Sequence, residues 1–385
     1  MFLSRYLATP LLTLVIAGLT SCDSKTAVAP SADAAGASNP TLATVEEAKR
    51  LRLPQSQELF EAGQQALQKG GEDLRILELK VKAFLDKPSN VTLKQAQETW
   101  FQAALAYRHF DYFRHIALVD PQRFPTLNRA DYQIAAYPIR PGFLDAYGPY
   151  KFSGLVYDVG FPFNQNSLEN QHGLTDVSEV VLGLYAIEFL LFNVEVKRDP
   201  RDFLPVATLN AEHKEKGYQS IAEIPKNRRR KLLKLQAELL VKDFEALQAK
   251  WLNETESDIY AQWQSLDPEA AFRTLARTTE STLVQILTEI GELNQDEPRF
   301  MHVSPQVFAS SFAVKQVYVC RAIHSAAKAI EIQEEQVDTA ARTHYTRALE
   351  LCGVESLGEG TEEKDHWREM FSAVKGTSDA LANRS

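Results

Sequence analysis

The stretch DVSEVVLGLYAIEFLLFN, residues 176–193, decides how this sequence folds. Asp176 is followed three residues later by Glu179, a capping-box pattern that predicts a helix beginning at this point. Between residues 180 and 192, Glu188 is the only charged side chain. A helix that is apolar on nearly all sides is typical of the interior of a large protein, and this one is too short to span a bilayer. The pattern therefore predicts a carboxylate carried into a core.

A buried Glu188 is costly unless it meets a cation, a metal ion or several hydrogen-bond donors. Tyr185 lies three residues earlier on the same helical face, where its hydroxyl can join the same polar site. Gly183 removes a side chain one turn from Ile187 and allows another backbone to come close. Two interpretations fit equally well: a ligand-binding carboxylate, or a glutamate paired with an internal arginine for packing order alone.

These residues also carry a resemblance. GLYAIE (183–188), preceded by HGLTD (172–176) and followed by FLLF, resembles the G-x-H-x-x-E signature of imelysin-like proteins. Upstream, YPIRPGFLD (137–145) is similar to the aromatic and proline-rich segment of that family, which ends in an aspartate. The resemblance is specific over residues 137–192 and weaker elsewhere. One position departs from the signature, because Tyr185 stands where the family has histidine.

The resemblance implies two packed helical bundles, an iron-related function and, for some members, a proposed metallopeptidase activity. It also implies which residues form a ligand site in a cleft between the bundles. FMHVSP (300–305) faintly resembles a His-Ser segment in the second half of such proteins. The predicted ligand-binding residues are Tyr185, Glu188, Arg140, Asp145 and His302.

The N-terminus resembles a lipoprotein signal. Arg5 precedes an apolar core, and LTSC (19–22) matches a lipoprotein cleavage box, which makes Cys22 the predicted lipidation site. Residues 1–21 are the predicted signal peptide, and residues 22–43, rich in Ala, Ser, Pro and Thr, are the predicted disordered tether. The expected location is the periplasmic side of a bacterial cell envelope, with the membrane bound through this lipid.

The composition limits the class of partner. The net charge of −9 becomes −10 without residues 1–21, which contain one arginine, and this disfavours nucleic acid as a partner. Two cysteines follow the predicted lipidation site, Cys320 and Cys352. One disulfide and two buried thiols are both compatible with them.

Beyond the tether the chain is dominated by helix formers, and we expect an all-α fold of two packed bundles, residues 44–205 and 206–385. Aromatic residues at helical spacing in 91–116 indicate a core. The proline-rich stretch 120–171 lacks periodicity, which favours a ligand-facing segment. The basic run 226–231 indicates a solvated face or, alternatively, contact with anionic lipid. Besides 176–193, the helices are expected at 56–85 (interrupted near Gly70), 91–116, 227–251, 269–294, 305–330, 334–352 and 361–381.

The chemistry favours binding over catalysis. A His-x-x-Glu pair on one helix suits a metal ion, but here the nitrogen is absent, and a tyrosine with an ordinary pKa near 10 is costly to ionise. The sequence holds no H-E-x-x-H, no G-x-S-x-G, no P-loop and no dinucleotide fingerprint, so no catalytic residue is predicted.

The preferred hypothesis is a lipid-anchored protein that binds a metal ion, iron or zinc, or a small polar ligand, with Glu188 as the candidate metal ligand. The imelysin resemblance alone implies iron uptake and envelope iron-uptake proteins as partners. The alternatives are an imelysin-type metallopeptidase and a degenerate member with a pure interaction role.

Overall fold

The computed structural model describes residues 40–193, 197–252, 258–266, 268–289, 307, 311–312, 315–324, 339–353 and 361–382. The chain divides into two compact units, Met1–Glu46 and Glu47–Ser385. In the first unit the described residues, 40–46, are helical. The predicted signal peptide, most of the tether and Cys22 lie outside the described residues. Everything below concerns the second unit.

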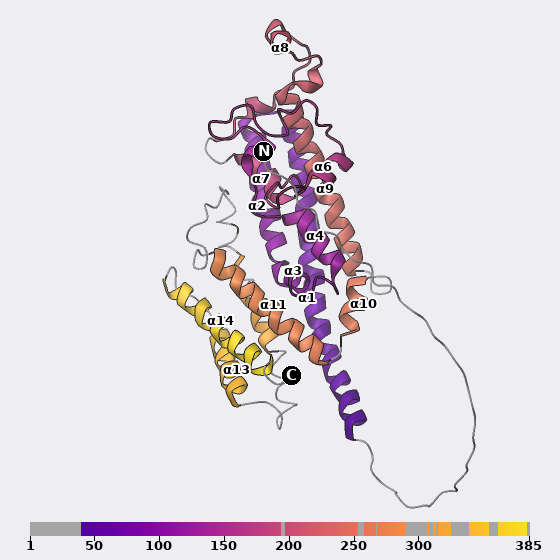
Figure 1. Ribbon diagram of the computed structural model, residues 1–385, viewed down its shortest axis with the longest axis vertical. Helices are drawn as coiled ribbons and strands as arrows, with labels where there is room; N and C mark the ends of the chain where they lie inside the picture. The colour runs from indigo at the N-terminus through magenta and orange to yellow at the C-terminus, as the bar shows by residue number, and fades with distance from the viewer. Residues whose placement is uncertain are drawn as a thin grey trace, which may run out of the picture. The chain divides into compact units, whose positions relative to one another are not determined.

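Throughout the described residues the regular structure is helical, with one isolated bridge between Tyr147 and Tyr150, which confirms the all-α prediction. Figure 1 shows the arrangement. The α-helices are α1 (Pro40–Asp86), α2 (Asn90–Arg108), α3 (Asp111–Val119), α4 (Pro125–Ala135), α5 (Pro141–Leu144), α6 (Gln165–Gln171), α7 (Leu184–Phe192), α8 (Ala211–Glu215), α9 (Pro225–Leu252), α10 (Asp258–Gln264), α11 (Pro268–Glu289), α13 (Thr339–Cys352) and α14 (Thr361–Ala382). Two 3-10 turns, η1 (Pro200–Phe203) and η2 (Ile221–Glu223), and a helical segment at residues 315–324 complete the set.

The long helices α1 and α9 run side by side (Figure 1). Our expected break in α1 near Gly70 is wrong, because the helix continues through it. A Cβ atom at Gly70 would lie 2.8 Å from the ring of Phe244 on α9, so the glycine serves close packing between helices. Next to it, the Gln248 side chain of α9 donates a hydrogen bond to the Leu67 carbonyl of α1 at 2.7 Å.

Helix α14 packs on both α11 and α13, and α11 also packs against α3. The division of the chain at residues 205 and 206 stays a prediction. Helix α9, which follows that point, packs against α4 and α7, which precede it.

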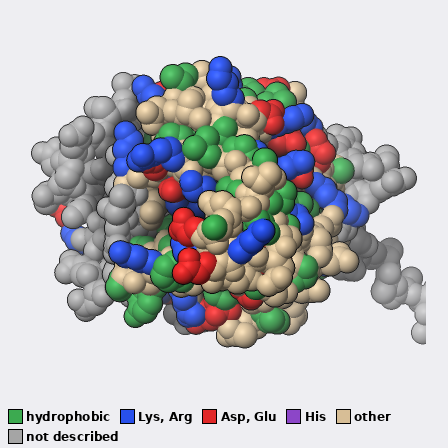
Figure 2. All heavy atoms as spheres, turned by 90° about the horizontal axis from the view of Figure 1, so that it is seen from above, with side chains coloured by type: hydrophobic (Ala, Val, Ile, Leu, Met, Phe, Trp, Pro, Cys, Tyr) green, Lys and Arg blue, Asp and Glu red, His purple; other side chains and the backbone are tan. Residues whose placement is uncertain are grey.

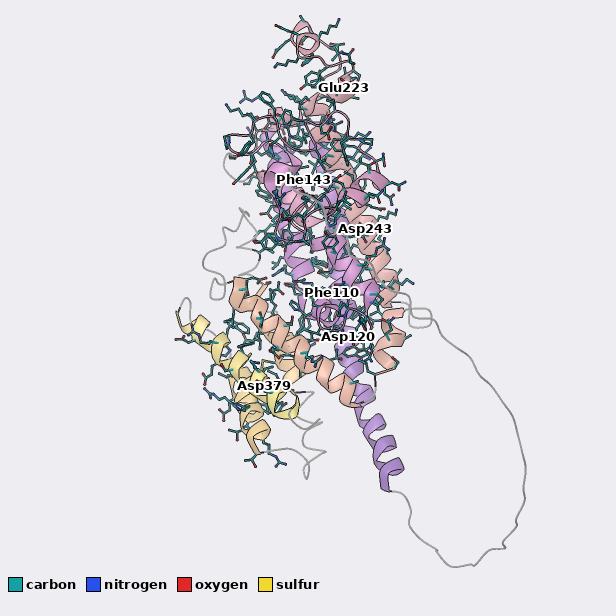
Figure 3. The ribbon with its side chains drawn as sticks, in the orientation of Figure 1. Phe110, Asp120, Phe143, Glu223, Asp243 and Asp379 are labelled. Carbon is teal, nitrogen blue, oxygen red and sulfur yellow. A yellow bond between two sulfur atoms is a disulfide. The ribbon has the colours of Figure 1, made fainter. Side chains whose placement is uncertain are left out.

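The aromatic stretch 91–116 forms core, as predicted. Phe110 lies 5.6 Å from Phe113 and 5.3 Å from Trp251, ring centre to ring centre, and all three are buried. Figure 3 labels Phe110 among the side chains that fill the space between helices. The stretch is two helices rather than one, because the chain turns at His109 and Phe110 between α2 and α3.

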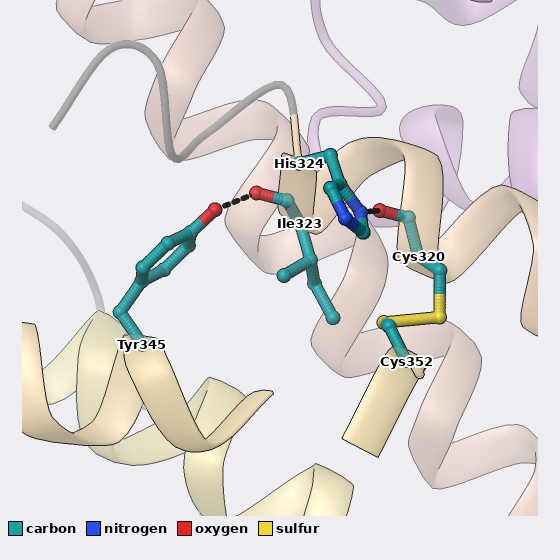
Figure 4. The surroundings of a disulfide bond; sticks show 5 residues. All are labelled: Cys320, Ile323, His324, Tyr345 and Cys352. Carbon is teal, nitrogen blue, oxygen red and sulfur yellow. Dashed lines mark hydrogen bonds between the residues drawn. A yellow bond between two sulfur atoms is a disulfide. The ribbon is translucent and has the colours of Figure 1, made fainter. Parts of the chain in front are cut away.

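Cys320 and Cys352 form a disulfide that joins the helical segment 315–324 to the end of α13 (Figure 4). The Tyr345 hydroxyl of α13 donates a hydrogen bond to the Ile323 carbonyl of the same segment. Of the two alternatives that the sequence left open, the structure shows the disulfide.

The surface mixes charges of both signs with hydrophobic side chains, as the face in Figure 2 shows. Several large exposed hydrophobic residues lie in the loops between α5 and α7: Tyr150, Phe152, Val159, Leu174 and Val177. None of the described helices combines the length and hydrophobicity that crossing a membrane requires.

Candidate functional site

Helix α7 carries the predicted motif but begins eight residues later than expected. Asp176 does not cap a helix. Its Oδ1 accepts hydrogen bonds from the amide and hydroxyl of Ser178 at 2.8 and 2.6 Å, which closes a local turn. The chain then passes through Gly183 at φ 88°, and the helix starts at Leu184. A Cβ at Gly183 would lie 2.5 Å from the Ile134 carbonyl oxygen, so glycine is required there.

Side chains from other elements hold the carbonyls in and beside α7. Trp100 donates to the Leu184 carbonyl at 2.7 Å, and Gln97 donates to the Leu191 carbonyl at 2.8 Å. Arg198 donates to the Phe189 carbonyl at 3.2 Å, where a cation also favours the helix C-terminus. These bonds fix the orientation of the motif helix.

Tyr185 and Glu188 are both buried, with 1% and 2% of their surfaces exposed, as the sequence predicts for Glu188. The ring of Tyr185 lies 5.3 Å from that of Tyr137. Burial raises the pKa of Tyr185 well above its ordinary value, although Arg108 acts in the opposite direction. The tyrosine is therefore a neutral phenol rather than a ready phenolate.

A network of buried charges lies close enough to Tyr185 to influence its pKa. Arg108 at the end of α2 forms ion pairs with Asp111 of α3, at 2.9 Å, and with Glu289 of α11. The Lys315 ammonium lies between the same two carboxylates, 3.0 Å from Asp111 and 2.9 Å from Glu289. These four side chains are nearly inaccessible to solvent, so the charges are compensated inside the protein.

The network continues through Arg114, whose guanidinium lies 2.8 Å from Asp111 and 3.0 Å from Asp131 of α4. The Tyr107 hydroxyl donates a hydrogen bond to Asp131 at 2.8 Å. The network thus contains three cations and three anions: Arg108, Arg114 and Lys315 against Asp111, Asp131 and Glu289. Our sequence reasoning missed this network.

One signal for it existed in the sequence. Arg108, Asp111 and Arg114 recur at intervals of three within an otherwise aromatic stretch, which places three charges on one side of a buried segment. Glu289 and Lys315 gave no signal, since each lies in an ordinary amphipathic pattern.

The other predicted site residues have partners of their own. Arg140 is half exposed and pairs with Asp176 at 3.0 Å and Glu179 at 3.2 Å. Asp145 is fully buried and binds Arg229 through both carboxylate oxygens, at 2.5 and 2.9 Å. Their convergence with Tyr185 and Glu188 on one ligand stays a prediction. His302 lies outside the described residues.

The arginines of the basic run at the start of α9 bind carbonyl and carboxylate groups inside the protein, so our solvated-face interpretation is wrong. Arg228 donates hydrogen bonds to the carbonyls of Leu155, Val156, Asp158 and Phe161, all within 3.0 Å. Arg229 binds Asp145, and Arg230 donates to the carbonyls of Leu85 and Phe203. The run organises the proline-rich stretch, whose carbonyls would otherwise lack donors.

His172, which could have lent a nitrogen to a ligand, has a structural role. Its Nδ1 accepts hydrogen bonds from the amides of Val181 and Leu182, both at 3.1 Å, so its Nε2 carries the proton that is donated to the Tyr132 carbonyl at 2.9 Å. Burial lowers the pKa of His172. The neutral imidazole therefore joins Val181 and Leu182, just before α7, to the Tyr132 carbonyl.

Among the residues that the structure describes, the donor set around Tyr185 does not fit a metal ion. Within the described ranges, no three His, Cys, Asp or Glu side chains are grouped as metal ligands. The motif nitrogen is replaced by the neutral phenol of Tyr185, and the nearby carboxylates of Asp111 and Glu289 are held by Lys315 and Arg108.

A separate small hollow, partly open to solvent, lies among α3, α4, α9 and α10. It is lined by hydrophobic side chains alone: Phe113, Ile116, Phe124, Leu127, Trp251, Ile259 and Trp263. It contains none of the predicted site residues.

The fold and the buried motif thus define an all-α protein with a polar pair inside an apolar helix. The model of the Imelysin family matches residues 54–347, and the chain belongs to this family. The chain is similar to the solved structure of an iron-regulated protein A precursor from Parabacteroides distasonis ATCC 8503, with 11% sequence identity and a TM-score of 0.45. That alignment covers 88% of this chain and 94% of the other. No curated protein matches.

Proposed function

We propose that this chain is a lipid-anchored envelope protein that binds a small polar ligand at the Tyr185 and Glu188 face of α7. The observation that carries the proposal is the burial of both side chains on a helix that is otherwise apolar. Polar groups are placed in such surroundings where their hydrogen bonds are used, and a ligand is one way to use them.

The sequence left a metal ion and a small polar ligand open. The donor chemistry favours the polar ligand, since Tyr185 is a neutral phenol and the carboxylates of Asp111 and Glu289, which act on it, face protein cations. A phenol and a carboxylate together donate and accept hydrogen bonds, which suits hydroxyl, amine or amide groups. A role in iron uptake carries over from the imelysin resemblance as part of the proposal.

The anchor at Cys22 is likewise part of the proposal. Its support is the cleavage box at residues 19–22. The disulfide between Cys320 and Cys352 is consistent with an oxidising compartment such as the periplasm.

Native mass spectrometry of the protein purified from its own membranes tests the proposal. We expect the wild type to retain an added small-molecule mass that denaturation releases, and Glu188→Gln to lose it while unfolding at the same urea concentration. Glu212→Gln, which changes an exposed glutamate in α8, is the matched control and should keep the added mass. Equal masses on the wild type and Glu188→Gln would contradict the proposal.

A growth experiment tests the link to iron. A deletion strain complemented with Glu188→Gln should grow poorly under iron chelation, whereas Glu212→Gln should restore growth. Equal growth of the two complemented strains would remove iron uptake from the account.

A further inference from the structure

Lys315 holds a position that a bound cation would need. Its ammonium lies 3.0 Å from an oxygen of Asp111 and 2.9 Å from an oxygen of Glu289, between carboxylates from two different helices. A metal ion shared by these carboxylates would sit about 2.0–2.2 Å from an oxygen of each. The ammonium and such an ion would overlap, so the carboxylates can hold one or the other.

The charges around this position already balance. Arg108 pairs with the same two carboxylates, and Arg114 links Asp111 to Asp131. Lys315 is 1% exposed, and a buried ammonium is stable only where counter-charges surround it. Adding a divalent ion beside three buried cations would require one of them to leave or to lose its charge.

The tyrosine at the motif position points the same way. The charges of Arg108, Asp111, Arg114 and Glu289 act on the pKa of Tyr185, so the motif helix lies within electrostatic reach of the network. Tyr185 lacks the nitrogen that would bind a metal ion, and the Lys315 ammonium supplies the positive charge that such an ion would bring.

We propose that Lys315, supported by Arg108, is a built-in counterion for Asp111 and Glu289, and that the Tyr185 site binds its ligand without a metal ion. This inference rests on the proposed function of that site. It assigns Lys315 a positioning role, because the ammonium holds the carboxylates beside the site in place of a metal.

Zinc binding tests the inference. Purified wild type, Tyr185→His, Lys315→Met and the double variant are incubated with Zn²⁺, desalted and measured by elemental analysis. We expect less than about one-tenth of an ion per chain in the wild type and in Tyr185→His, and about one in the double variant, where a nitrogen is added and the Lys315 charge no longer competes for Asp111 and Glu289. Zn²⁺ should also raise the melting temperature of the double variant and leave that of the wild type unchanged.

Stoichiometric zinc in the wild type or in Tyr185→His would overturn the inference, because Lys315 would then fail to exclude the metal. A folded double variant without zinc would overturn it as well. If Lys315→Met does not fold, Lys315→Gln removes the charge while keeping a donor for the hydrogen bond to Glu289, and the same outcomes apply. Failure of the proposed function is detected separately, by native mass spectrometry, if Glu188→Gln keeps the small-molecule mass of the wild type.

Discussion

At the scale of the residue, Gly183 decides where the motif helix begins. Its φ of 88° is in the left-handed region, and a side chain would meet the Ile134 carbonyl at 2.5 Å. Gly183→Ala should therefore lower the free energy of unfolding by at least about 2 kcal/mol, measured by urea titration.

Gly217 supplies the control for this prediction, since its φ of 87° is nearly the same but nothing lies near the place of a Cβ. Gly217→Ala should cost only the backbone strain, about 1 kcal/mol. Equal losses in the two variants would show that the contact with Ile134 is unimportant.

Asp145 makes a second test at this scale. It is fully buried and neutralises Arg229, with Arg198 at 3.5 Å. Asp145→Ala leaves buried guanidinium groups without their carboxylate, and we expect a loss of about 3–5 kcal/mol in the free energy of unfolding. Glu98→Ala breaks an exposed pair with Lys94 and should unfold like the wild type. A mild effect of Asp145→Ala would favour its predicted ligand-binding role over a structural ion pair.

How far the sequence predicts single residues depends on how local their environment is. The burial of Glu188 follows from the apolar residues on every side of it within one helix. The arginines 228–230 look like a solvated run, because their partners lie in segments far away in the sequence. No local pattern announces that four carbonyls of residues 155–161 converge on one guanidinium.

At the scale of the element, the disulfide fastens the helical segment 315–324 to α13. The two cysteines are 32 residues apart, and closing a loop of this size stabilises the fold by roughly 3–4 kcal/mol in the chain-entropy model. We expect a reductant to lower the urea midpoint of the wild type. The double variant Cys320→Ser, Cys352→Ser should start from the lower midpoint and show no response to reductant.

Two buried histidines, His172 before α7 and His115 in α3, make the stability of the fold depend on pH. Burial lowers the pKa of His172, and burial together with Arg114 lowers that of His115 to about 3. Below a pH of about 6.5 the unfolded chain binds protons that the folded chain refuses, so stability falls as the pH falls. The urea midpoint should therefore decrease from pH 7.5 to pH 5.

His172→Asn isolates one part of this pH dependence, because its Oδ1 can accept the same amide hydrogen bonds without titrating. Its midpoint should change less between these two pH values than that of the wild type. Asp243, labelled in Figure 3, acts in the opposite direction. Burial and then Glu169 raise its pKa to about 6, so its protonation favours the folded chain between about pH 6 and 4. An unchanged pH response in His172→Asn would shift the effect to His115.

Helix boundaries show where sequence patterns fail. The Asp176 and Glu179 spacing is that of a capping box, yet Asp176 closes a turn with Ser178 and Glu179 pairs with Arg140. The same residue types serve caps and turns, and the positive φ of Gly183 decides between them. In α1, glycines that look like an interruption allow α9 to come close.

At the scale of the whole molecule, the fold class and the family follow from the sequence, while the surroundings of the motif do not. Residues 108, 111, 289 and 315 meet because α3 packs against α11, and that packing depends on side chains along both helices. The sequence therefore predicts the burial of Glu188, whereas the charged network that acts on Tyr185 is found only in the structure.

A crystal structure of the protein purified from its own membranes tests the central claim most directly. The account predicts electron density for a small molecule within hydrogen-bond distance of the Tyr185 hydroxyl and the Glu188 carboxylate, with the Lys315 ammonium between Asp111 and Glu289. Protein groups as the only partners of the Glu188 carboxylate and the Tyr185 hydroxyl would contradict it.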